Sequence, residues 1–189
     1  MKPMPSLRVL AVAGGRFDKG PKAKAPIAYL YTEGIQPLRL RLRWVEVDGL
    51  DATRVTLEVM KKIHGRLDVL MAASIPIAGF NLIDPMAIHR GTGVPVIFTL
   101  DRMPDNDAVV SALRRHFGDW EARVKVIRSV GKVIEFPWNG DRLLLECLGI
   151  HPQKAKELVK RLLVFGRVPE PLRIAGMAAR SLGWLESKG

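Results

Sequence analysis

The sequence alternates strictly between leucine and arginine in Leu38-Arg39-Leu40-Arg41-Leu42-Arg43, at the start of a run that continues to Val47. Successive side chains of a β-strand point to opposite faces, so this run predicts a strand with one leucine face and one arginine face. After Asp48-Gly49 the apolar residues recur at helical spacing, and Asp51 stands where an N-cap belongs. The change of period predicts a strand, a tight turn and a helix in succession.

Outward from this unit, short apolar runs and turn residues predict the other elements. A run over residues 7–13 ends at Gly14-Gly15, as a buried strand before a tight turn does. Asn139-Gly140 favours a hairpin turn. The segment 120–128 fits a helix and a strand equally well. The remaining predicted strands cover residues 27–31, 68–72, 94–100, 132–136 and 142–148, and the predicted helices cover residues 82–90, 104–117, 152–163 and 170–185.

This order of elements predicts an α/β fold with a mixed sheet. Three early strands joined by short links favour an antiparallel meander, and the alternation of strands and helices that follows favours parallel strands flanked by helices. The chain has 189 residues, of which 48% are hydrophobic and 26% are charged. These values fit one domain over residues 1–189, since a single core typically organises about 100–200 residues.

The cysteine content and the first residues predict a cytoplasmic protein. Cys147 is the only cysteine, so it cannot form an internal disulfide, and its apolar surroundings in the sequence favour a buried structural thiol. Residues 1–5 contain no apolar run typical of a secretion signal. No stretch approaches the ~20 apolar residues that span a bilayer, so no membrane association is expected.

The charge balance favours a polyanionic partner, with DNA or RNA as the natural candidate. The formal net charge is +11, from 30 Lys and Arg against 19 Asp and Glu. Along the predicted strand, Arg39, Arg41 and Arg43 recur at about 7 Å, close to the spacing of phosphates along one nucleic-acid strand. The alternative is an edge strand that uses charge to prevent aggregation. The predicted contact residues are Arg39, Arg41, Arg43, Arg114, Arg115 and Lys132.

The sequence contains no strong signal for a metal site. Asp48 and Asp51 lie between a strand and a helix, where carboxylates can bind a divalent cation, but turn and cap chemistry explains both residues. The four histidines show no paired spacing of the kind that holds zinc. No cofactor is therefore expected.

Three segments carry a resemblance to a known family. They are Val47-Asp48-Gly49-Leu50-Asp51-Ala52-Thr53, Ile77-Ala78-Gly79-Phe80-Asn81-Leu82-Ile83-Asp84 and Pro169-Glu170-Pro171-Leu172-Arg173-Ile174-Ala175. The chain resembles, over nearly its whole length, an archaeal family known as domain of unknown function 99, which is related to endonuclease V. The resemblance implies a ribonuclease H-like sheet in which the first and fourth strands lie side by side and carry metal-binding aspartates.

This sequence departs from that family pattern at three places. Ala13 stands where the resemblance implies an aspartate at the end of the first strand, and Ala73 stands where it implies one at the end of the fourth. Gly176 stands where relatives tend to have a histidine. Metal-assisted cleavage of a phosphodiester needs several converging carboxylates. Four acidic residues do match family positions, namely Asp48, Asp51, Asp84 and Glu170.

These observations predict a protein that binds nucleic acid without cleaving it. One alternative is a Mg²⁺- or Mn²⁺-dependent endonuclease whose ligands have moved to Asp48, Asp51 and Asp84. The other is a scaffold subunit whose sheet edge or terminal helices bind protein.

Overall fold

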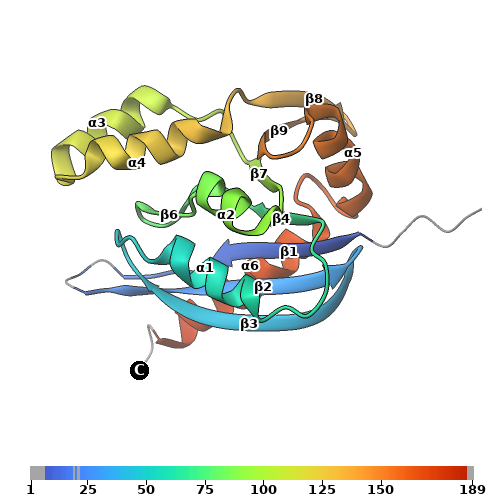
Figure 1. Ribbon diagram of the computed structural model, residues 1–189, viewed down its shortest axis with the longest axis horizontal. Helices are drawn as coiled ribbons and strands as arrows, with labels where there is room; N and C mark the ends of the chain where they lie inside the picture. Colours follow the sequence, from blue (N-terminus) through green and yellow to red (C-terminus); the bar gives the residue numbers. More distant parts are fainter. Residues whose placement is uncertain (1–6, 19, 21, 187–189) are drawn as a thin grey trace, which may run out of the picture.

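Three antiparallel strands form one half of the central sheet (Figure 1). The computed structural model describes residues 7–18, 20 and 22–186. Strand β1 (Arg8–Gly14) pairs with β2 (Lys24–Glu33), and β2 pairs with β3 (Gln36–Glu46), both in antiparallel register. The predicted meander is therefore confirmed. Residues 1–5, to which the expectation about a secretion signal refers, lie outside the described residues.

Parallel strands form the centre of the sheet. After helix α1 (Ala52–Lys61), strand β4 (Val69–Ala72) runs parallel to β1. A small hairpin of β5 (Pro76–Ala78) and β6 (Asn81–Leu82) precedes helix α2 (Pro85–Thr92). Strand β7 (Val96–Leu100) then adds in parallel to β4. The first and fourth strands thus lie side by side, as the family resemblance implies.

The last part of the chain completes the sheet and covers its second face. Helices α3 (Asn106–His116) and α4 (Trp120–Ile127) and the 3₁₀ helix η1 (Arg128–Val130) lead into a hairpin of β8 (Ile134–Trp138) and β9 (Asp141–Leu148). Helices α5 (Pro152–Leu162) and α6 (Glu170–Glu186) follow. The strand order is β3-β2-β1-β4-β7-β9-β8, with β9 antiparallel to β7. The predicted α/β class with a mixed sheet is confirmed.

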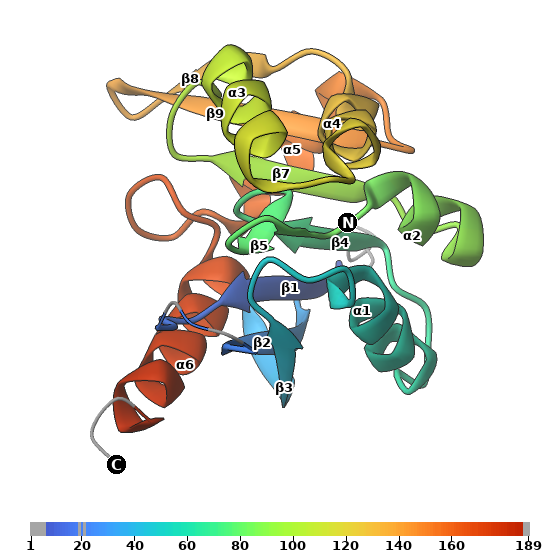
Figure 2. The ribbon, with the colours of Figure 1, turned by 90° about the vertical axis from the view of Figure 1, so that its left-hand side faces the viewer.

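The sheet separates two apolar layers. On one face, α1 and α2 bury Val55 and Ile88 against strand residues such as Tyr29 and Phe98. On the other face, α5 and α6 bury Leu158 and their neighbours against the same strands. Helices α3 and α4 pack on each other and lie at the opposite end of the molecule from β3 (Figures 1 and 2). No helix among the described residues is long and apolar enough to cross a membrane.

The ends of several elements differ in detail from the sequence predictions. Asp51 stands at the N-cap of α1 but makes no capping hydrogen bond; the side chain of Asn81 accepts from the Ala52 N–H at 3.0 Å instead. Helix α2 begins at Pro85, three residues later than expected, because the Asp84 side chain caps it. Segment 120–127 is a helix. Strand β8 extends through Pro137. Proline lacks a backbone N–H, and an edge strand tolerates it where that N–H would face away from the neighbouring strand.

Glu146 gives the fold an expected pH dependence. It lies on β9 opposite the buried Phe98, and burial raises its pKa from the ordinary 4.5 to about 7. Between these two values the folded protein holds a proton that the unfolded chain has released, so stability falls as pH rises through this window. Because Glu146 is partly solvated, we expect a loss of about 1–2 kcal/mol. In Glu146→Gln this part of the slope should be absent from urea unfolding between pH 4.5 and 7.5; a slope identical to that of the unchanged protein would contradict the assignment.

Candidate functional site

The three positions that depart from the family pattern meet in one cavity. The parallel register of β1 and β4 aligns Val12 with Ala72, so Ala13 and Ala73 follow at neighbouring strand ends. Gly176 faces them from α6. Together they line a cavity of about 350 Å³, called the β1–β4 cavity here. Its other lining residues are Val12, Gly14, Ser74, Pro76, Ile77, Val168, Leu172, Arg173 and Arg180.

A second cavity opens beside the first. It has a volume of about 790 Å³ and lies between the end of β7 and helix α3, and it is called the α3 cavity. The two cavities share Ala73 and Ser74, so they form one groove across the carboxyl ends of the central strands. Phe80 and the 60% exposed Met103 supply apolar surface to the α3 cavity. In Figure 2 the β5–β6 hairpin lies between α3 above and α6 below.

The charged side chains of the groove differ in how they are paired. Arg173 of the β1–β4 cavity is paired with Glu170, which lies outside the lining and accepts hydrogen bonds from Nε and Nη2 of Arg173 at 2.7 and 2.6 Å. This contact lowers the pKa of the Glu170 carboxyl group. Asp101 pairs with Arg167 at 3.1 Å. Asp105 caps α3 by accepting from the Ala108 N–H at 2.9 Å.

Two arginines of the groove have no such counter-charge. Arg102 lines the α3 cavity and Arg180 lines the β1–β4 cavity. Both are exposed, and neither forms an ion pair within the described part of the chain. The groove therefore presents unpaired positive charge and little free negative charge. Both arginines escaped the sequence prediction, because neither stands in a basic run.

The acidic residues that match family positions each have a structural partner. Asp48 accepts from the Phe80 N–H at 2.7 Å, and Asp51 accepts from the Asn81 side chain at 2.6 Å. Asp84 accepts from the first N–H groups of α2 at 2.9 and 3.1 Å. Over the described residues, no three His, Cys, Asp or Glu side chains gather into a group that could hold a metal ion. The side chains around the β1–β4 cavity do not fit a divalent cation, since no carboxylate lines it.

The role of Asp84 as a cap can be measured directly. We expect Asp84→Ala to lower the free energy of unfolding by about 1 kcal/mol, because two N–H groups at the start of α2 lose their acceptor. Asp84→Asn keeps a side-chain oxygen and should lose much less. Urea unfolding of the two variants measures this difference. Equal losses would indicate that the negative charge of Asp84, and not its capping oxygen, is what the protein uses.

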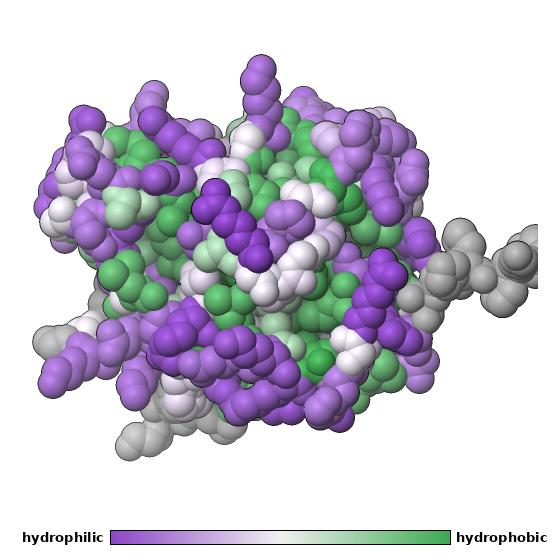
Figure 3. Space-filling model, viewed as in Figure 1, coloured by the Kyte–Doolittle hydropathy of each residue, from purple (hydrophilic) through white to green (hydrophobic). Residues whose placement is uncertain are grey.

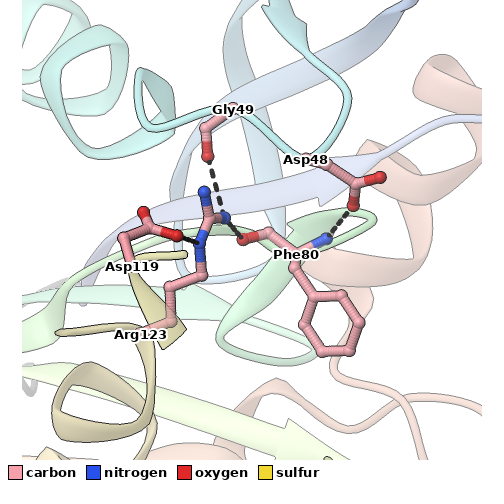
Figure 4. A network of polar contacts seen from close by, with 5 residues as sticks. All are labelled: Asp48, Gly49, Phe80, Asp119 and Arg123. Atoms are coloured by element: carbon pink, nitrogen blue, oxygen red, sulfur yellow. Dashed lines mark hydrogen bonds and ion pairs between the residues drawn. The ribbon is translucent and has the colours of Figure 1, made fainter. Parts of the chain in front are cut away.

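A buried arginine holds the far wall of the groove in place. Arg123 of α4 donates to the backbone oxygens of Phe80 at 2.6 Å and Gly49 at 3.3 Å, and to Asp119 at 2.9 Å (Figure 4). Its guanidinium also stacks on the Phe117 ring at 4.3 Å. Only 6% of the Arg123 side chain is exposed. This side chain ties the turn after β3 and the loop that carries Phe80 to α4.

The residues predicted to contact nucleic acid do not form one surface. Arg39, Arg41 and Arg43 lie on the edge strand β3, which the two ribbon views place at the opposite end of the molecule from α3. Arg115 shares a face of α3 with Ala108 and Ala112, both of which line the α3 cavity. The remaining two residues have other surroundings: the guanidinium of Arg114 stacks on Trp120 at 4.4 Å, and Lys132 is exposed before β8.

Cys147 is half-buried. Its Sγ lies 3.6 Å from the carbonyl oxygen of Ile150, and burial raises the pKa of its thiol. A raised pKa keeps the thiol protonated and unreactive. The sequence predicts a buried structural thiol; the raised pKa agrees with a structural role, but the thiol on β9 is less buried than expected.

Comparisons with known proteins agree with this geometry. A UPF0215 protein of Pyrococcus horikoshii is 37% identical over 147 residues, which make up 77% of this chain and 75% of the relative. A crystal structure of a protein of unknown function from Archaeoglobus fulgidus superposes with a TM-score of 0.83 at 27% identity, covering 93% of this chain and 98% of that one. Ciona intestinalis endonuclease V, in complex with DNA containing an inosine followed by a ribo-adenosine, superposes with a TM-score of 0.59 at 11% identity over 97% and 87% of the two chains.

The sheet topology and the similarity to endonuclease V place the protein in the ribonuclease H-like class of folds. The family model described as endonuclease dU matches residues 5–183, and the chain belongs to this family. The predicted relationship to an archaeal family akin to endonuclease V is thereby confirmed.

Proposed function

We propose that this protein is a non-cleaving member of its family that binds nucleic acid in the groove across β1, β4 and β7. The observation that carries the proposal is the convergence of Ala13, Ala73 and Gly176 on one cavity that no carboxylate lines. Cleavage assisted by bound metal ions needs ligands that hold the ions at the scissile phosphate. Small neutral side chains leave space at this place but supply no such ligand.

The charges of the groove support binding in place of cleavage. Arg180 and Arg102 lie on the two sides of the shared residues Ala73 and Ser74. Arg115 shares a face of α3 with two residues that line the α3 cavity. Arginine binds phosphate oxygens through a fork of N–H donors. Contacts of this kind position a nucleic-acid backbone without reading its sequence. Endonuclease V of Ciona, which shares the fold, was crystallised with DNA.

Fluorescence anisotropy with labelled single- and double-stranded DNA and RNA tests the proposal. Between about 50 and 300 mM salt we expect binding that weakens steeply, with probes that stay intact in Mg²⁺ or Mn²⁺. Each of Arg102→Ala and Arg180→Ala should reduce the slope of log affinity against log salt by about one. Arg90→Ala, at an exposed arginine of α2 outside the groove, is the matched control and should leave the slope unchanged.

Any of three results would reject the proposal. Absence of binding even at about 50 mM salt would reject a nucleic-acid partner. Metal-dependent cleavage that disappears in Asp48→Asn would show that the protein is an endonuclease with relocated ligands. A change of slope in Arg90→Ala as large as in Arg180→Ala would reject the groove as the binding place.

A further inference from the structure

Strand β3 has features that nucleic-acid binding in the groove does not explain. It is an edge strand of eleven residues, and within the described chain no strand pairs with its outer side. The backbone N–H and C=O groups along such an edge form a ready template for another strand. In Figure 2 it lies at the lower end of the sheet, away from α3 and α4.

One face of β3 is apolar and exposed. Leu38, Leu40, Leu42 and Trp44 are 49%, 45%, 37% and 40% exposed. They lie on the same side of the sheet as α6, because Leu42 is paired with Ala28 and Leu40 with Leu30, two residues of the core beneath that helix. Helix α6 packs mainly on β1 and β2 and less on β3, so this row stays partly exposed. Contiguous apolar rows of this kind mark surfaces that a partner covers.

The other face of β3 is cationic. Arg39, Arg41 and Arg43 alternate along it, and no described carboxylate forms an ion pair with any of them. Among the described residues, Nε of Arg41 is buried without a hydrogen-bond partner, and Arg43 donates to the carbonyl oxygen of Leu42. Figure 3 shows hydrophilic side chains gathered along the lower rim of this view, where β3 and α1 lie.

A second copy of this chain does not fit the edge. Two β3 strands can pair antiparallel about a twofold axis that is perpendicular to the sheet. This arrangement places the arginine faces of both copies on the same side, so Arg39, Arg41 and Arg43 of one copy would lie opposite the same arginines of the other. Like charges directly opposite each other destabilise a strand pair. The net charge of +11 on each copy adds further repulsion.

Nucleic acid also fits only part of the surface. Phosphates would match the arginine row, but they neither pair with the open backbone edge nor cover the leucine row. An added protein strand does both, because it forms backbone hydrogen bonds along the edge and places alternate side chains on the two faces.

We propose that β3 is the docking edge for an extended segment of an acidic protein partner, in which carboxylate and apolar side chains alternate. The carboxylates lie beside Arg39, Arg41 and Arg43, and the apolar side chains lie against Leu38, Leu40, Leu42 and Trp44. This surface is separate from the groove, and its partner is protein. The alternation of the strand selects an alternating partner, since opposite charges and apolar pairs across two strands both stabilise the pairing.

Amide hydrogen exchange on the full-length protein tests the proposal. The probe is a synthetic peptide of about ten residues in which Glu and Val alternate, and its counterpart carries Lys in place of Glu. We expect the Glu peptide to slow exchange of the β3 amides by about tenfold or more, and the Lys peptide to have no effect. Unchanged exchange of the β3 amides with the Glu peptide overturns the proposal, and this result needs no variant that might misfold.

A charge exchange identifies the arginine row as the recognition element. In the triple variant Arg39→Glu, Arg41→Glu, Arg43→Glu the preference should reverse, so that the Lys peptide binds at least tenfold more tightly than the Glu peptide. Arg90→Glu on α2 should keep the original preference. If the Glu peptide fails to bind and the triple variant instead loses affinity for single-stranded DNA, the row binds nucleic acid, as the sequence suggested, and docking of an acidic strand is excluded.

Discussion

Arg123→Met is expected to lower the free energy of unfolding by about 2–4 kcal/mol. The substitution keeps a long apolar side chain in a nearly closed site, but it removes the donors for two backbone carbonyl oxygens, those of Gly49 and Phe80. A partly buried acceptor left without a partner costs about 1–3 kcal/mol. The contacts with Asp119 and the Phe117 ring are lost as well. Urea unfolding, monitored by circular dichroism, measures the change in the midpoint urea concentration; the dependence of the free energy of unfolding on urea concentration should stay the same.

The matched control for this variant is Lys125→Met on the same helix, where the side chain is exposed. It should change stability by less than about 0.5 kcal/mol. Arg123→Met should also weaken nucleic-acid binding in the groove, because Phe80 lines the α3 cavity and its carbonyl loses an anchor. A loss of stability no greater than that of the control would show that the network of Figure 4 does not hold the two loops to α4.

Introducing carboxylates at the ends of β1 and β4 is expected to create a divalent-cation site there. In Ala13→Asp/Ala73→Asp the new side chains would stand at the ends of adjacent parallel strands, since Val12 and Ala72 are register partners. Two neighbouring carboxylates repel each other without a cation and share one when it is present. At a Mn²⁺ concentration about 100-fold above the dissociation constant, the stabilisation is about 2.7 kcal/mol. For a chain of this size that raises Tm by roughly 5–10 °C.

Thermal unfolding with and without Mn²⁺ measures this effect, and calorimetric titration measures the affinity. The control is Ala13→Asn/Ala73→Asn, which has nearly the same shape but no charge and should show no shift with Mn²⁺. The unchanged protein should show none either. A shift of equal size in the unchanged protein would mean that a cation already binds to it elsewhere, and no shift in the aspartate variant would mean that the two strand ends do not present their side chains to a common point.

Much of the fold follows from local pattern. The Leu-Arg alternation of β3, the Asp48-Gly49 turn and the Asn139-Gly140 hairpin are all where the sequence predicts them, and the last two use positive φ angles at Asp48, Asn139 and Gly140. The sequence did not decide between helix and strand for the segment that forms α4, because its apolar residues fit both the helical and the strand period. The β5–β6 hairpin was not predicted, since its strands are too short to show a period.

The candidate site, too, was predictable from the sequence only in part. The sequence shows which residues stand at Ala13, Ala73 and Gly176, and the family resemblance gives these positions their meaning. Their convergence follows from the parallel pairing of β1 with β4 and from the packing of α6 across β1. Arg180 and Arg102 could not be selected from the sequence, because nothing near them marks them among so many cations.

The sequence by itself determined the type of most elements, the excess of positive charge and the neutral residues at the strand ends. These properties depend on residue identity and on the spacing of residues over a few helical turns or along one strand, and both can be read directly from the sequence. Only the tertiary structure decided which side chains share the groove, that Arg123 joins Gly49 to Phe80, and that the leucine row of β3 stays partly exposed. Those contacts join residues far apart in the chain, and they arise from the packing of whole helices and strands, on which local periodicity carries no information.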